Sequence, residues 1–313
     1  MQTKMVSYIS GSLLFLPLFF ASFYAVLVVS RGSGLDQWLP KWDTLLIIGA
    51  IVLLERIARY RYAVPQRHMW RRDVISTFIN VYVTGAATSA LVLPVIAFLP
   101  ELLFGRGLFV ASPDQLGPLW LQVPIVLLLV SFYKYWMHRL QHSNAFLWEL
   151  HSYHHRVTDL TAANTFVSHP IDFALRNVVI YLLLGLVGFD PFALLLAIPA
   201  TQISGIVSHC GADVKGGLLN YVFVTPEVHR WHHAAKTPAG HKYAVNYGVE
   251  FCFWDRLFGT FHLPRTKAHP EQPEQIGEPT GLPDERSYLR LLLVPLGLYR
   301  PLPWFNRAPR VPG

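Results

Sequence analysis

Long apolar stretches restrict the fold of this chain more than any other feature. Residues 7–30 and 74–99 contain no charged side chain, and residues 119–137 contain only Lys134. Each stretch is long enough to cross a bilayer as a helix, which takes about 20 residues. We interpret residues 7–30 as a retained helix, because a signal peptide has a shorter apolar core. With 52% hydrophobic and 14% charged residues and a mean hydropathy of +0.34, the sequence predicts an all-α, polytopic membrane helix bundle.

Three further apolar stretches are shorter or interrupted. Residues 42–54 either span with the help of their flanks or lie shallow in the membrane. Residues 173–206 are divided near Gly188 and Pro191, which predicts a helical hairpin that enters the membrane and returns. Residues 289–298 are interrupted by a proline, and we expect them to lie at the interface.

The distribution of positive charge predicts the orientation. The chain has a net charge of +7, and six arginines lie between residues 56 and 72, between two apolar stretches. Lys and Arg gather in this way in cytoplasmic loops. They are not interleaved with aromatic residues as in a nucleic-acid site, so we expect no nucleic-acid partner. The predicted topology puts both termini, the arginine-rich loop and the histidine clusters described next on the cytoplasmic side.

Three histidine clusters stand out, with the sequences HRLQH, HSYHH and HRWHH. Residues three or four apart share one face of a helix, so we expect each cluster to point at one spot. The hairpin at residues 173–206 would deliver an isolated histidine to the same surface. Eight converging imidazoles are too many for one tetrahedral zinc and are enough for two metals with open positions. The clustered histidines are His138, His142, His151, His154, His155, His229, His232 and His233, and the isolated ones between the second and third clusters are His169 and His209.

An ordinary buried position would suit these histidines poorly. Each neutral imidazole has a polar N–H and a polar nitrogen that need partners, and charged imidazoles would repel one another. A bound metal removes both problems. Cys210 and Cys252 are the only cysteines and form no C-x-x-C motif, which argues against a cysteine-ligated metal.

The position of the clusters beside membrane helices limits which metals and reactions suit the site. Imidazole binds iron, zinc, copper and nickel, so ligand type alone does not choose the metal. A metal pair at the mouth of apolar helices faces a substrate with a lipid tail, whose C–H bonds are unactivated. Attack on such bonds needs oxygen activated on iron or copper, and zinc has no redox chemistry. Our hypothesis is a di-iron oxygenase that acts on a lipid with O2. A redox-silent di-zinc membrane hydrolase stays open, and a metal transporter is disfavoured because residues 7–30 and 74–99 carry no ionisable group.

In their order and spacing, the three clusters resemble the motifs of the fatty acid hydroxylase/sterol desaturase superfamily of membrane di-iron enzymes. Two other segments also resemble that family: Asn246-Tyr247-Gly248 followed by WDRLFGT at residues 254–260, and Ser168-His169-Pro170 with Asp172. The resemblance covers about residues 133–261. It implies two irons, O2 and electrons from a separate reductase, ferredoxin or cytochrome b5-like donor. The metal ligands that it implies are His138, His142, His151, His154, His155, His209, His229, His232 and His233.

Some assignments stay open in the sequence. Some family members pair the isolated histidine, His209 here, with a second histidine four residues later, where this chain has Asp213. Three alternatives stay open: Asp213 is a metal ligand, it supports a ligand, or the ligand set has one member fewer. For His169 we favour a capping or supporting role over a ligand. We expect Asp255 and Arg256 to pair or cap, and Trp254 and Phe258 to pack beneath the clusters. The candidates to orient the second ring nitrogen of the ligands are Asp159, Asn164, Asp172, Glu227 and Asp255.

The predicted organisation has three parts. Residues 1–132 form N-terminal transmembrane helices, residues 133–262 form the di-iron catalytic domain, and residues 263–313 form a Pro-rich basic tail. We expect a bacterial inner membrane. The substrate stays open among a sterol, a carotenoid, a fatty acyl chain, an alkylglycerol and an aminolipid headgroup such as that of an ornithine lipid. Hydroxylation and desaturation are not separated by the spacing of the motifs.

Overall fold

The computed structural model describes residues 42–57, 69–104, 116–241, 244–264 and 271–277, together with residues 21 and 292. Apart from single residues, the predicted helix at 7–30 and the interfacial stretch at 289–298 lie outside these residues. In the described part of the chain every regular element is a helix, and β pairing is limited to two isolated bridges. The elements are α3 (Trp42–Ile57), α4 (Trp70–Thr77), the π-helical η1 (Phe78–Thr84), α5 (Gly85–Phe104), α6 (Leu119–Ser143), α7 (Ala145–His155), η3 (Ala162–Asn164), α8 (Pro170–Val187), α9 (Pro191–Ser208), η4 (Gly217–Tyr221), α10 (Pro226–His232) and α11 (Phe253–Leu257).

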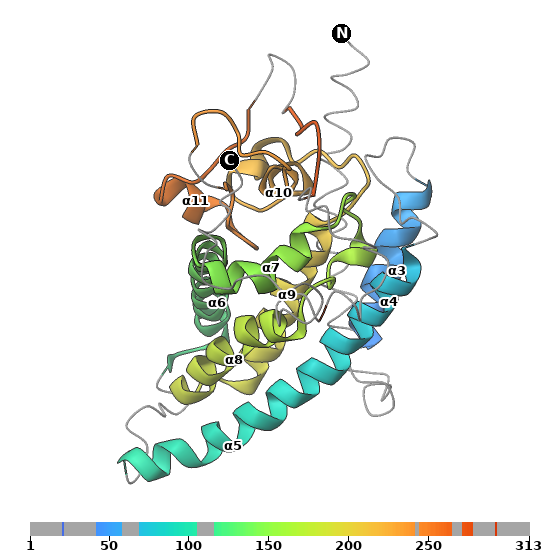
Figure 1. Cartoon of the computed structure of the whole chain (residues 1–313). Coiled ribbons are helices and arrows are strands. Elements are labelled where there is room, and N and C mark those ends of the chain that lie inside the picture. The colour runs from blue at the N-terminus through green and yellow to red at the C-terminus, as the bar shows by residue number, and fades with distance from the viewer. Residues whose placement is uncertain are drawn as a thin grey trace.

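Three of the described helical segments are long and apolar enough to cross a membrane, at Trp70–Ile96, Leu119–Ser143 and Pro170–Val187. The first joins α4, η1 and most of α5 into one long helix (Figure 1). Large side chains such as Leu91, Phe98 and Trp120 are more than two-thirds exposed, as a lipid-facing surface requires. The all-α membrane bundle predicted from the sequence is therefore confirmed. The apolar stretch predicted as a span ends at residue 137, but the helix that contains it, α6, continues to Ser143 and includes the first histidine cluster.

The predicted hairpin consists of α8 and α9. Gly188 ends α8 with φ of 83°, a left-handed conformation that glycine adopts without strain. Asp190 then caps α9 by accepting a hydrogen bond from Phe192 N at 2.7 Å. The backbone N–H of Asp190 donates to Gln122 Oε1 at 2.9 Å, which places the turn of the hairpin beside the start of α6.

The other end of the bundle is held by the long helix. Asn80 in η1 donates to the carbonyls of Phe166 and Ser168, just before α8 begins, at 2.8 and 2.9 Å. The start of α8 therefore lies beside η1, and α6 and α9 end where α7 and α10 gather (Figure 1). Helices α6, α8 and α9 pack through buried apolar residues such as Val126, Ile180 and Ala197. The fold thus brings the three histidine clusters and His209 to one end of the bundle.

Candidate metal centre

Nine histidines meet at this end in two adjacent groups. Within each group the ring nitrogens that can serve as ligands all lie within 4.8 Å of one another. Every one of these side chains is 6% exposed or less. The first group contains His138, His142, His151, His155 and His232, and the second contains His154, His209, His229 and His233.

The two H-x2-HH clusters are shared between the groups, which corrects the expectation that each cluster points at one spot. On α7, His151 and His155 belong to the first group and His154 to the second. An α-helix turns by about 100° per residue, so side chains at i and i+4 lie about 40° apart while i+3 lies to the other side. His229 and His233 follow the same rule, with His232 facing the first group. Each triplet therefore bridges the two groups.

Helix ends fix these segments locally. Asn144 caps α7 by accepting a hydrogen bond from Leu147 N at 3.1 Å. Thr225 caps α10, and Pro226 occupies its first turn. His209 follows directly after α9, where the hairpin returns it to the cluster.

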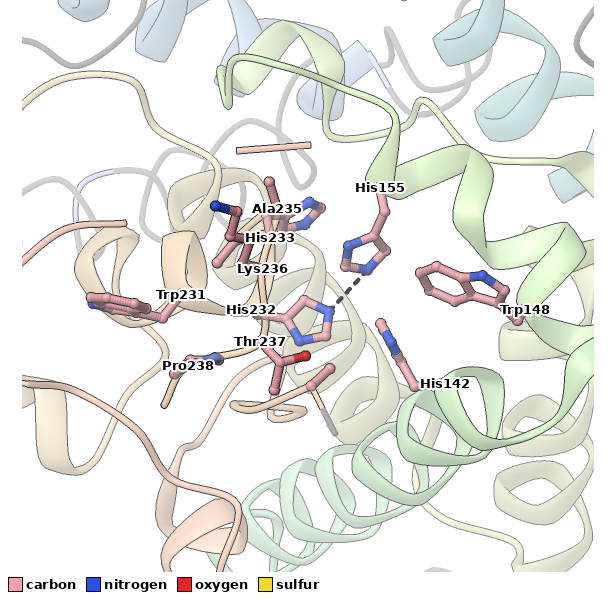
Figure 2. A pocket seen from close by; sticks show the side chains of 12 residues that line it. His142, Trp148, His155, Trp231, His232, His233, Ala235, Lys236, Thr237 and Pro238 are labelled. Atoms are coloured by element: carbon pink, nitrogen blue, oxygen red, sulfur yellow. Dashed lines mark hydrogen bonds between the residues drawn. The ribbon is translucent and has the colours of Figure 1, made fainter. Parts of the chain in front are cut away.

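The free ring nitrogens fit a metal. Buried nitrogens of His138, His142, His151, His229 and His233 have no hydrogen-bond partner among the described residues. A buried polar atom without a partner costs about 1–3 kcal/mol, and coordination of a cation removes that cost. The Nε2 atoms of His155 and His232 face each other at 3.1 Å, with the ring of His142 beside them (Figure 2). The donor set is entirely imidazole, which suits iron, zinc, copper or nickel.

Backbone carbonyls hold the opposite nitrogen of three of these rings. Nδ1 of His138 donates to Tyr247 O at 2.8 Å, and Nδ1 of His232 donates to Val245 O at 2.8 Å. Nδ1 of His154 pairs with Val167 O at 3.1 Å. Such bonds fix the tautomer and leave Nε2 free to bind metal. None of these three carbonyls was predicted from the sequence, because a backbone acceptor is present at every residue and carries no signal in the residue type.

Two of the five predicted orienting side chains contact the histidines. Asp172 Oδ2 lies 3.4 Å from Nδ1 of His151, and Asn164 Oδ1 lies 3.4 Å from Nδ1 of His209. Asp159 holds Asn164 through its backbone carbonyl, at 2.6 Å. Glu227 instead accepts hydrogen bonds from Gly216 N and from the side chain of an asparagine on η4.

Asp255 acts on the centre through a loop. Its carboxylate accepts hydrogen bonds from Tyr247 N at 2.6 Å, Gly248 N at 2.8 Å and Thr260 Oγ1 at 2.7 Å. Burial raises the pKa of Asp255 to about 6, and these hydrogen bonds oppose the rise. A Cβ on Gly248 would lie only 2.5 Å from Phe251 O, so the tight loop requires glycine.

This corrects the expectation that Asp255 pairs with Arg256 or caps a helix. The guanidinium of Arg256 instead lies 5.7 Å from the centre of the Tyr221 ring. Trp254 and Phe258 do pack near the centre, because Phe258 stacks on Tyr135 one turn before His138 and Trp254 lies edge-on to Phe132 of the same helix.

Asp213 and His169 lie outside both groups. Asp213 forms an ion pair with Lys215. His169 caps α8 by accepting a hydrogen bond from Ile171 N at 3.2 Å, which is the capping role the sequence favoured.

Burial keeps the histidines neutral and ready to bind metal. It is the largest cause that lowers the pKa of His209 and of His232 to about 3. The pKa values of His154, His155, His229 and His233 are also lowered, first by burial and then by neighbouring imidazoles. A neutral imidazole is the form that coordinates a metal.

The apolar helices and the buried histidine groups together define an integral-membrane protein with a centre able to hold metal ions. Residues 123–260 match the family model described as fatty acid hydroxylase. The resemblance to the fatty acid hydroxylase/sterol desaturase superfamily found in the sequence is therefore confirmed for this segment, which is somewhat less than half of the chain.

Curated relatives span several lipid-modifying enzymes. The ornithine lipid hydroxylase OlsE of Rhizobium tropici is 39% identical, over 49% of this chain and 45% of that protein. Sphinganine C4-monooxygenase 1 of Arabidopsis thaliana is 30% identical over 45% of this chain and 54% of its own length. The Delta(7)-sterol 5(6)-desaturase ERG3B of Gibberella zeae is 25% identical over 58% and 57%. The chain thus aligns with about half the length of these relatives, and no solved structure matches it.

Proposed function

We propose that this protein is an integral-membrane di-iron oxygenase that hydroxylates or desaturates a lipid with O2 and external electrons. The observation that carries the proposal is the pair of adjacent, buried, all-histidine groups at the end of apolar membrane helices. The names of three relatives, an ornithine lipid hydroxylase, a sterol desaturase and a sphinganine monooxygenase, support the reaction class. Bound iron would supply the oxygen activation that cleavage of an unactivated C–H bond requires.

In this proposal the protein contributes by holding the metal ligands in fixed positions. The nine histidines hold the metals, and the carbonyls of Tyr247, Val245 and Val167 orient three of the rings. Asp172 and Asn164 do the same for His151 and His209. Burial of the whole centre excludes water, which protects reactive species from side reactions.

A second candidate within the same family is hydroxylation of an aminolipid headgroup. The similarity to an ornithine lipid hydroxylase favours it. So does a cavity against the histidines whose wall includes Asn177, Thr201 and Gln202, because a purely hydrocarbon substrate offers these polar groups no partner.

The partners and the location follow from the same reading. We propose a separate electron donor of the ferredoxin, reductase or cytochrome b5 type, and a centre at the cytoplasmic face of a bacterial inner membrane. The proposed catalytic domain is residues 133–262, flanked by membrane helices and a basic tail.

The test replaces one histidine of each group. We expect His154→Ala and His232→Ala to lower the bound metal and to reduce the O2-dependent lipid product to background, while the protein still inserts in membranes. His241→Ala is the control, because His241 packs against His262 outside both groups. The product is measured by the mass of total lipid extracts, in which a gain of one oxygen indicates hydroxylation and a loss of two hydrogens indicates desaturation. Full activity in either variant contradicts the ligand set, and activity without O2 favours a di-zinc hydrolase.

A further inference from the structure

A cavity of about 120 Å³ opens against the histidines from the side of the membrane helices. Its lining includes histidines of both groups, so a molecule in it would reach both metal positions. Its other walls come from α6, α8, α9 and two loops. The apolar side chains in these walls are Phe173 of α8 and, from the loops, Phe166 and Val249. These walls suit part of a lipid.

Two cations also line this cavity. Lys134 lies on α6 and Arg176 on α8, and both helices are candidate membrane spans. Charged side chains are costly within a membrane and mark the path of a polar substrate or ion when they face a cavity. Lys134 precedes His138 by four residues, so it sits about one helical turn, 5.4 Å, to the membrane side of the histidines.

Arg176 has donors left over for a ligand. Its Nη2 contacts Asp172 Oδ2 at 3.1 Å and Ser168 Oγ at 2.9 Å. Asp172 is fully shared, since it also pairs with His151 and accepts hydrogen bonds from Gln141 and Ser168. Meanwhile Nε of Arg176 is buried with no hydrogen-bond partner among the described residues. A guanidinium offers five N–H donors in a fork that matches a carboxylate or a phosphate.

Arg176 also lies close to the histidines, because the Asp172 carboxylate that it contacts at 3.1 Å is 3.4 Å from Nδ1 of His151. Lys134 forms an ion pair with Glu250 at 2.6 Å, yet its side chain remains 18% exposed.

We propose that this cavity receives the anionic group of a lipid headgroup, a carboxylate or a phosphate, and that Arg176 is the residue that binds it. This rests on the proposed function, because the same lipid is the substrate. With the anion at Arg176, a headgroup carbon a few bonds away faces the histidines, and the acyl chain extends along α6 and α8 toward the membrane.

The test measures binding rather than turnover. The full chain, loaded with metal and kept without O2 or reductant, is titrated in detergent with N-palmitoylornithine and with its methyl ester. The two probes share the acyl chain and the amine and differ only in the negative charge. Lysophosphatidic acid and monopalmitoylglycerol form a second pair, which distinguishes phosphate from carboxylate.

We expect the wild-type protein to bind the anionic member of at least one pair about tenfold or more tightly than its neutral partner, as a charge-assisted hydrogen bond predicts. Arg176→Gln should abolish this preference, and Arg176→Lys should keep part of it. Arg139→Gln is the matched control, because Arg139 stacks on Trp136 and does not line the cavity. It should behave as wild type.

Equal affinity of the wild type for both members of both pairs overturns the proposal, and so does a preference that survives in Arg176→Gln. If Arg176→Gln also loses metal or binds the neutral probes more weakly, Arg176→Lys decides. A preference retained there supports anion binding, and a lost one shows that Arg176 only supports Asp172. A protein that discriminates the probes but yields no product retains this inference and loses the proposed function.

Discussion

Asp255 lies outside both histidine groups, yet it determines the position of two carbonyls that hold them. The carboxylate binds the N–H groups of Tyr247 and Gly248, and the same loop presents the carbonyl of Tyr247 to His138 and that of Val245 to His232. Asn246 between them has φ of 57°, a strained value for a residue with a Cβ, and its amide is fastened to Val228 O and His262 O. One carboxylate thus orients ligands from α6 and α10.

Replacing Asp255 should release this loop and weaken metal binding. In Asp255→Ala two backbone N–H groups and one hydroxyl lose a buried acceptor, each at about 1–3 kcal/mol. We expect a lower unfolding temperature and about 10–100-fold weaker metal retention, as for other residues that support ligands. Metal content after dialysis against a chelator measures the second effect. Arg256→Gln is the neighbouring control, and equal metal loss in both variants would argue against a role for the loop.

The histidines also predict how stability depends on pH. An unfolded imidazole has a pKa near 6.5, whereas burial lowers the pKa of His209 and His232 to about 3. Between these values the unfolded chain binds protons that the folded chain does not, so stability must fall as the pH is lowered through this window. Each such histidine contributes about 1.4 kcal/mol per pH unit.

The raised pKa values of Glu55 and Asp255 act in the opposite direction, but the histidines with lowered pKa values outnumber these two carboxyl groups. We therefore expect the metal-free protein to unfold at a lower temperature at pH 5 than at pH 7.5. His209→Ala should reduce this slope, and His241→Ala, outside the centre, should leave it unchanged. An unfolding temperature that is constant or rises on acidification would mean that the folded protein binds these protons.

At the level of the helices, the sequence predicted where the helices lie along the chain. It did not predict which distant segments come into contact. Apolar runs and capping residues located α5, α6, α8 and α9, and the division at Gly188 correctly returned His209 to the clusters. Helix geometry explains why each H-x2-HH triplet contributes to both histidine groups. The spacing alone does not predict that there are two groups.

The backbone groups that form hydrogen bonds with the histidines could not be predicted from the sequence. The carbonyls of Tyr247 and Val167 reach their histidines only through tertiary packing. Glu55 is a similar case. It stands near the end of an apolar run and reads as a helix boundary, yet it is fully buried and accepts hydrogen bonds from Ala162 N and Gly211 N. It thereby ties α3 to the segments that carry Asn164 and His209.

For the whole molecule, the two ends of the bundle differ in kind. At one end α6 terminates in histidines, α8 begins beside them, and Asn80 of η1 binds the segment that precedes α8. At the other end the turn of the hairpin meets the start of α6 through Asp190 and Gln122. In the sequence, the arginine-rich stretch at residues 56–72 comes directly before the long helix that begins with α4. From the positive-inside rule we predict that the histidine side is cytoplasmic.

Cysteine labelling tests this orientation. Cys210 and Cys252 are 2% and 0% exposed, so an introduced cysteine reports alone. Ser143 is exposed at the histidine end of α6, and Pro118 is exposed at its other end. A membrane-impermeant maleimide should label Ser143→Cys in inverted vesicles but not in intact cells, and Pro118→Cys should give the opposite result. Labelling of both positions from one side would mean that α6 does not cross the membrane, and a reversed pattern would put the centre on the outer face. The reversed pattern would separate the histidine centre from a cytoplasmic electron donor, because electrons delivered from the cytoplasm must reach it at the surface where α6 ends.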